Sequence, residues 1–414
     1  MVLSKLRIIE NASRRMQRLG YLKLLLSQAS QSSTSNLKSL GSNLINTVTQ
    51  LISIPPTPEL ANYLQVTLSG QPDKSLLQQL EKSLSLTKPT DIMVQIQDVY
   101  LSSKKLLSQR GRLVPRDSTN YPRLGVSLGL LRKDSYVPLV RGQVLLHLIE
   151  PDEVRAFREY NSDINPMLLT QEQQFFFIYT FTESDMHIII PLYRKLLEEK
   201  EDFTDYEAGN LLPEILRDIY KHFRQQISTG ADAIRLKKLL KTAEVIELWR
   251  DREYKGTGAR DEAITVRLEP LVDLGILVKD YPLAYRYRMS SPGRHLMTLL
   301  TETRDDPDIE SRFFAHIIDA YGLRLKRLSG DSDRLPFIYE SFSRLKSPLG
   351  YAPINDVMLL GILLAIQSKQ GYFEMQDGMQ TVRAIQKKYP RLVRFNVDRM
   401  GKLNFIKFEK EIPE

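Results

Sequence analysis

Residues 259–300 constrain the fold more than any other stretch, because they combine a helical pattern, a glycine stop and a two-residue alternation. Apolar residues recur at helical spacing from Asp261 to Leu274. Gly275 follows at the position where a helix end often needs a positive φ. Pro270 interrupts the pattern, since proline removes a hydrogen bond and kinks a helix. The stretch therefore predicts a helix that stops at Gly275, with either a kink or a fresh helix start at Pro270.

A hairpin and a second helix are predicted next. Residues 276–278 have the pattern of a short apolar strand, and residues 280–282 have a composition that is typical of a turn. Between residues 285 and 289 tyrosine and arginine alternate, which places the tyrosines on one face of a strand and the arginines on the other. Ser290, with Pro292 in the following turn, predicts the start of a new helix.

This order of helix, strand, turn, strand and helix resembles the second half of a winged-helix domain. The resemblance implies that the first helix enters the major groove of DNA and that the hairpin is a wing. It would place Arg260 and Arg267 on the reading helix, and Arg286 and Arg288 on the wing. The alternative is a small α+β core with a solvated arginine edge, because arginine on an exposed strand also blunts that edge.

The chain contains this pattern twice. Leu128–Asp134 parallels Leu274–Asp280, and Val140–Leu145 then parallels Ser291–Leu296. The two copies indicate an internal repeat of helix, glycine, hairpin and helix. Two unrelated helix–glycine–strand junctions are the alternative.

The last segment predicts a third unit of this kind, although the repeated motif is absent from it. Residues 357–367 and 379–389 have helical patterns, and residues 391–397 and 403–408 have the pattern of a hairpin. Residues 331–353 are expected to be loop-rich.

We therefore expect a mostly α (α+β) fold in which tandem winged-helix units are joined by helical segments. The expected parts are an N-terminal helical region with a Ser-rich linker at 1–90, a first winged-helix-like unit at 91–150, an acidic helical middle at 151–230, a second unit at 231–303, and a C-terminal helical region at 304–414 that could hold the third unit.

Charge is distributed unevenly along the chain, whose formal net charge is +8. From Glu150 to Asp218 sixteen acidic residues oppose six basic ones, a balance of −10, so the remainder carries +18. A positive excess favours an anionic partner, with nucleic acid before a membrane surface. The acidic middle is expected to face away from nucleic acid or to dock a protein partner. Thr170 and Asp185 are expected to cap its helices, and its aromatic run 175–181 to be core.

Catalysis and metal binding are not expected. The chain has no cysteine, which excludes disulfides, thiolate metal sites and cysteine nucleophiles. Ser127 lies in a nucleophile-elbow string, but that chemistry needs a strand before the serine and a helix after it. Here a turn-rich stretch precedes the serine and a strand pattern follows it. Glu253 and Lys255 have a nuclease-like spacing, yet the pattern puts them at a helix end. The five histidines are scattered, and no phosphate-binding glycine motif is present.

The expected function is non-catalytic binding of double-stranded DNA, with affinity supplied by phosphate contacts. The layout is similar to the DNA-reading halves of some restriction enzymes and to accessory subunits of bacterial defence or mobile-element systems. That similarity implies a cytoplasmic subunit of a larger complex, with a separate protein partner. No membrane segment, cofactor or small-molecule ligand is expected. The alternatives are a protein–protein scaffold built from winged-helix modules and a divergent nuclease. The expected DNA-binding residues are Arg112, Arg116, Arg123, Arg132, Lys133, Arg260, Arg267, Lys279, Arg286, Arg288, Lys387 and Lys388.

Overall fold

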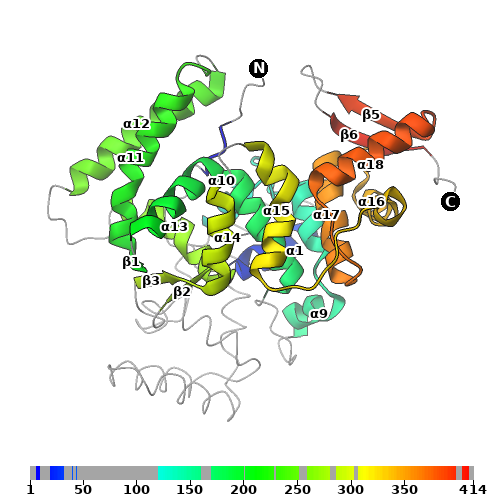
Figure 1. The fold of residues 1–414 in the computed structure, drawn as a ribbon, viewed down its shortest axis with the longest axis horizontal. Coiled ribbons are helices and arrows are strands. Elements are labelled where there is room, and N and C mark those ends of the chain that lie inside the picture. Colours follow the sequence, from blue (N-terminus) through cyan, green and yellow to red (C-terminus); the bar gives the residue numbers. More distant parts are fainter. Residues whose placement is uncertain are drawn as a thin grey trace, which may run out of the picture.

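The computed structural model of the chain is mostly α-helical and has two small antiparallel sheets (Figure 1), which confirms the expected α+β class. It describes residues 6–9, 19–31, 40, 43, 120–159, 169–199, 201–227, 230–250, 259–279, 286–302, 306–397 and 403–409. The helices are α1 (Gly20–Gln31), α7 (Asn120–Ser127), α8 (Val140–His147), α9 (Pro151–Glu159), α10 (Gln171–Glu199), α11 (Asp205–Phe223), α12 (Gly230–Arg250), α13 (Ala259–Asp273), α14 (Ser291–Glu302), α15 (Asp306–Ala320), α16 (Asp331–Leu345), α17 (Ile354–Gln367) and α18 (Met375–Lys388). The strands are β1 (Asp202–Thr204), β2 (Leu277–Lys279), β3 (Arg286–Met289), β4 (Ala352–Pro353), β5 (Val393–Val397) and β6 (Leu403–Phe408).

One continuous apolar core runs through the described residues, from Leu6 to Phe408. Helix α10 lies at its centre and packs against α11, α14 and α17. Phe175, Phe176 and Phe177 of α10 are fully buried, so the aromatic run is core, as predicted. None of the described helices is both long enough and apolar enough to cross a membrane.

The central sheet confirms the hairpin that the sequence predicts and adds a strand to it. Strand β3 pairs antiparallel with β2, with Tyr287 buried and the arginines on either side of it exposed. Strand β1 pairs with the other side of β3, so the strand order is β1-β3-β2. Ser290 accepts a hydrogen bond from the backbone N–H of Gly293 at 2.9 Å and so caps α14, as predicted.

The two glycine-centred junctions of the proposed repeat have the same local geometry. Gly129 has a φ of 70° and Gly275 a φ of 69°. In both copies the residue after the glycine donates its N–H to the carbonyl five residues earlier, at 2.7 Å from Leu130 and 2.9 Å from Ile276. A positive φ suits glycine because it has no Cβ. The helix stop is therefore built in the same way twice.

A second pair of glycines sets how closely the next helix approaches each junction. A Cβ on Gly142 would lie 2.3 Å from the carbonyl oxygen of Leu130, and a Cβ on Gly293 would lie 1.9 Å from that of Ile276. Both distances are far below van der Waals contact, so only hydrogen fits at these positions. The sequence repeat thus corresponds to a repeated close contact between a helix and the residue after the helix stop.

The hairpin itself is not repeated in the first copy. Helices α7 and α8 are joined through an isolated antiparallel bridge between Leu131 and Pro138, where the second copy has a three-stranded sheet. Both helices pack against α1 at the N-terminal side of the chain.

The C-terminal unit follows the order α16, β4, α17, α18, β5, β6 (Figure 1). Its sheet has the strand order β4-β6-β5, the same arrangement as the central sheet. The two predicted helices and the predicted hairpin are confirmed. The expected loop at 331–353 is wrong, because α16 occupies most of it. Pro336 lies inside this helix, and Phe337, Ile338, Phe342 and Leu345 bury its inner face.

The glycine contacts yield a stability prediction. Gly293→Ala should destabilise the protein more than Gly275→Ala, because a methyl group on residue 293 collides with backbone, whereas Gly275 has open space and only an unfavourable φ. We expect about 1–2 kcal/mol for Gly275→Ala and about 3 kcal/mol or more for Gly293→Ala. Chemical denaturation of both variants measures the difference, and equal losses would contradict the close contact.

Candidate nucleic-acid interface

Arg267, expected to contact DNA, lies in the interior. Its side chain is 6% exposed, and its Nε donates to the carboxylate of Asp185 at 2.5 Å. The same carboxylate accepts the backbone N–H of Ile9 at 2.8 Å. Burial raises the pKa of Asp185, and the neighbouring guanidinium opposes that shift. Arg267 therefore joins α13 to α10 and the N-terminal segment, and its assignment to a DNA-reading surface was wrong.

Helix α13 is a core helix rather than a reading helix. Every side chain from Ile264 to Leu271 is buried. Pro270 lies within α13 and does not end it. Asp185 interrupts α10, with a non-helical φ of −128° and ψ of 19°, but the predicted cap is wrong. Its side chain is used for the ion pair and not for capping, because a buried guanidinium needs a carboxylate more than a helix end does.

The buried ion pair leads to a second stability prediction. Arg267→Ala leaves Asp185 buried without its cation, and we expect a loss of about 3–5 kcal/mol. The control is Arg286→Ala, whose side chain is 57% exposed and pairs with Asp202. Its expected loss is below about 1 kcal/mol, because solvent screens an exposed pair. Urea denaturation compares the two variants, and a similar small loss for both would refute the interior role of Arg267.

The other expected DNA-binding residues do not form one cluster. Five are exposed at two places: Arg123, Arg132 and Lys133 around the first glycine junction, and Arg286 and Arg288 on β3. Arg112 and Arg116 lie outside the described residues. The side chains of Arg260 and Lys279 also lie outside them. The remaining two, Lys387 and Lys388, are exposed at the end of α18.

Helix α18 presents one solvent-facing stripe made of amides and cations. Its exposed side chains include Gln376, Gln380, Arg383 and Lys387. Their spacing of four, three and four residues puts them on one face of the helix. The opposite face is buried and packs on α16 and α17. The helix thus combines an anchored inner face with an outer face that carries no acidic side chain.

The positive charge continues past the end of the helix. Lys388 lies over the ring of Tyr389, with its Nζ 5.1 Å from the ring centre. Arg391 is exposed in the turn before β5, and Arg394 is exposed on β5, where it pairs with Glu409 at 3.0 Å. Of the cations described here, Arg383, Lys387 and Arg391 form no ion pair with any described residue. These cations are available to an anionic partner.

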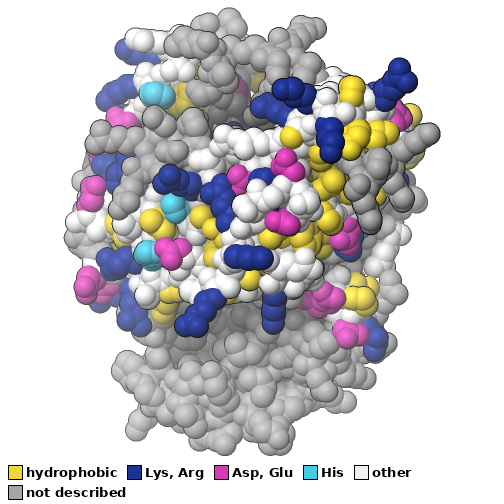
Figure 2. Space-filling view, turned by 45° about the vertical axis from the view of Figure 1, so that its right-hand side comes forward, with side chains coloured by type: hydrophobic (Ala, Val, Ile, Leu, Met, Phe, Trp, Pro, Cys, Tyr) yellow, Lys and Arg dark blue, Asp and Glu magenta, His cyan; other side chains and the backbone are white. Residues whose placement is uncertain are grey.

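A sequence signal for this cluster was present and was missed. Residues 378–408 contain eight lysine and arginine residues and one acidic residue, a net charge of +7. The whole chain carries +8. Counting charge in a moving window would have singled out this segment above the central one. Figure 2, which brings this side of the molecule forward, shows lysine and arginine side chains spread over the face.

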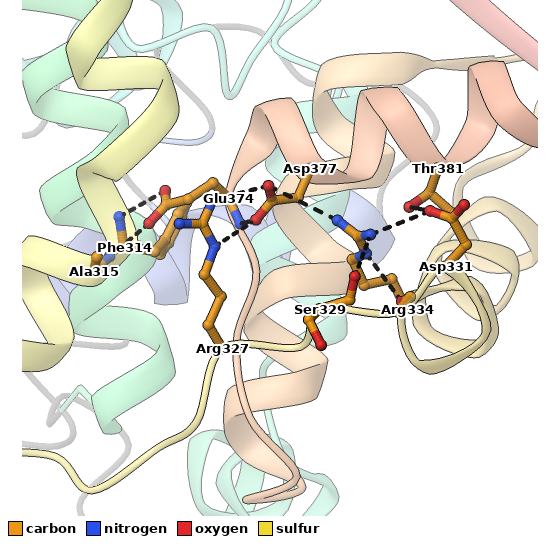
Figure 3. Close-up of polar contacts among 10 residues, drawn as sticks. Phe314, Ala315, Arg327, Ser329, Asp331, Arg334, Glu374, Asp377 and Thr381 are labelled. Atoms are coloured by element: carbon orange, nitrogen blue, oxygen red, sulfur yellow. Dashed lines mark hydrogen bonds and ion pairs between the residues drawn. The ribbon is translucent and has the colours of Figure 1, made fainter.

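Two carboxylates fix the N-terminal end of α18 (Figure 3). Glu374 is fully buried and accepts the backbone N–H groups of Phe314 and Ala315 in α15 at 3.1 and 2.7 Å. It also accepts a backbone N–H in the first turn of α18, while Asp377 accepts the N–H of Glu374 at 3.0 Å. This reciprocal capping satisfies backbone donors that a helix start leaves open. One buried residue therefore ties α18 to α15.

Arginine side chains complete the anchor. Arg327 binds Asp377 through two nitrogens at 2.9 and 2.8 Å. Arg334 of α16 lies 3.8 Å from the same carboxylate, and it donates to Asp331 at 3.1 Å. Thr381 of α18 donates to Asp331 at 2.7 Å. Asp377, the acidic residue in the first turn of α18, is thus neutralised by Arg327 and Arg334. It does not belong to the outer stripe of the helix.

Burial gives Glu374 an unusual titration. Removal from water raises its pKa to about 7 from an ordinary 4.5, although the two donors in α15 and Arg327 act in the opposite direction. A carboxylic acid with a raised pKa favours the folded state when protonated. Its stabilising contribution is complete below about pH 4.5 and is lost as the pH rises through about 7.

The expected measurement is a pH series of unfolding free energies. Relative to Glu374→Gln, the wild-type protein should lose on the order of 2 kcal/mol between pH 5 and pH 8, because only the wild-type residue ionises in that range. Glu340→Gln, at an exposed position of α16, is the control and should follow the wild-type pH dependence. Parallel curves for wild type and Glu374→Gln would contradict the assignment.

The acidic middle is partly used inside the molecule. Glu153 accepts a hydrogen bond from buried Lys23 at 2.5 Å, and Glu183 pairs with Arg141 at 2.7 Å. Arg141 also pairs with Asp356 of α17. Burial lowers the pKa of Lys23, and Glu153 opposes that shift. These carboxylates are therefore not part of an exposed docking face.

Where the structure describes them, residues of the motifs considered for catalysis have ordinary structural roles. Ser127 ends α7 and donates to the carbonyl of Arg123 at 3.0 Å, so a helix, not a strand, precedes it. Glu253 and Lys255 lie outside the described residues. Among the side chains that the structure describes, no group of three or more His, Asp or Glu residues could hold a metal ion.

Comparison with protein-family models, curated proteins and solved structures found no match to this chain.

Proposed function

We propose that this protein binds double-stranded DNA, and that residues 331–409 are a winged-helix unit whose reading helix is α18. The observation that carries the proposal is the exposed face of α18, where Gln376, Gln380, Arg383 and Lys387 accompany Ala384 and no acidic side chain is exposed. The order of elements and the strand order β4-β6-β5 support it, because α18 then takes the place of the helix that enters the major groove. The hairpin β5–β6 takes the place of the wing.

Duplex DNA suits this helix better than duplex RNA. The major groove of B-form DNA admits an α-helix, whereas the major groove of A-form RNA is too narrow for side chains to read. Lys387, Lys388 and Arg391 lie together at one end of the helix. Clustered cations of this kind bind phosphates and release counterions.

The test is the salt dependence of binding to a random duplex of about 20 base pairs, followed by fluorescence anisotropy. Lys387→Ala combined with Lys388→Ala should weaken binding about tenfold or more. It should also reduce the slope of log affinity against log salt by about two.

The matched control removes two positive charges elsewhere. Arg155→Ala with Lys221→Ala changes the net charge equally, at positions on α9 and α11 that are 61% and 68% exposed. The control should bind nearly as the wild type does. An equal loss in both double variants would mean that net charge alone governs binding. No binding at low salt would refute the proposed function.

A protein-docking function is the second candidate, and a different surface favours it. On α12, the large apolar side chains of Ile234 and Leu248 are 71% and 58% exposed. Ile234 and Leu248 are two heptads apart in the sequence, so their side chains lie near the same face of the helix. This candidate gains support if the salt titration detects no DNA binding.

A further inference from the structure

The outer stripe of α18 is divided by chemistry along its length. The first two positions, Gln376 and Gln380, carry uncharged amides, and the cations Arg383 and Lys387 follow, with exposed Ala384 between them. A helix that bound only phosphates would gain affinity from lysine or arginine at every exposed position. Amides contribute little to charge attraction, but they form paired hydrogen bonds with base edges.

The capping at the start of α18 disfavours phosphate binding at that end of the helix. A helix N-terminus attracts phosphate through open backbone N–H groups and the helix dipole. Here the carboxylates of Glu374 and Asp377 already accept such donors. Phosphate contact is therefore expected from the other end, where Lys387, Lys388 and Arg391 lie.

Taking the proposed DNA binding as given, we propose that α18 reads base sequence, with Gln376 and Gln380 recognising adenine and Arg383 recognising guanine. Glutamine matches the N6 and N7 groups of adenine, and arginine matches the O6 and N7 groups of guanine. From Gln376 to Arg383 the helix rises about 10 Å, which corresponds to about three base-pair steps of about 3.4 Å. The recognised core therefore contains adenine and guanine within about four base pairs.

The test is selection of binding sites from a pool of random duplexes by the full-length protein. The wild type should enrich a short core with adenine and guanine at neighbouring positions. Gln380→Ala should lower the preference at one adenine position about tenfold, because one pair of hydrogen bonds is lost. It should leave the salt slope unchanged, because no charge is removed. Lys387→Ala should instead weaken binding to all sequences alike and reduce the slope by about one.

Gln225→Ala is the matched control, since it removes an exposed amide in the turn after α11, a helix that lies on the opposite side of the molecule from α18 (Figure 1). It should enrich the wild-type core. Salt-dependent binding without an enriched core would overturn base reading and leave the proposed DNA binding intact. If Gln380→Ala enriches the same sequence core as the wild type does, the assignment of Gln380 to an adenine is wrong. An absence of any binding at low salt would overturn both proposals.

Discussion

Buried cations paired with carboxylates link distant segments of this protein across its apolar core. Lys23 pairs with Glu153, and Arg267 pairs with Asp185. Each pair joins segments that are far apart in the sequence, and each carboxylate comes from the acidic middle of the chain. A cation can be buried only where its charge is compensated, because the desolvation cost of an unpaired charge is large. Part of the acidic middle therefore compensates buried cations, and its charge excess does not by itself indicate a docking surface.

The same requirement separates structural cations from those available at the surface. Arg327 and Arg334 face Asp377 and fix the start of α18, whereas Arg383 and Lys387 face solvent on the outer side of that helix. Whether a basic residue is structural or available at the surface thus depends on whether a carboxylate lies beside it, and not on its residue type. It moves the strongest candidate for a nucleic-acid interface from the central unit to the C-terminal one.

Local interactions explain the parts of the fold that could be predicted. The helix stop at Gly275, the hairpin after it and the cap at Ser290 each depend on residues within a few positions of one another. Turn-forming residues, helix caps and two-residue alternation act over that range, so they can be recognised in the sequence. The predicted C-terminal hairpin and its two helices were correct for the same reason. Helix α16 was not predicted, although its buried apolar residues recur at helical spacing.

The sequence by itself determined where most helices and hairpins lie, that the class is α+β, and that the chain carries a repeated glycine-centred junction. Only the tertiary structure decided which cations are exposed. Arg267 and Lys387 are both basic residues on helices, but one lies against Asp185 and the other has solvent around it. That difference arises from packing between segments about 80 residues or more apart. No local pattern reports such packing, because burial and ion pairing depend on which distant carboxylate the fold brings near.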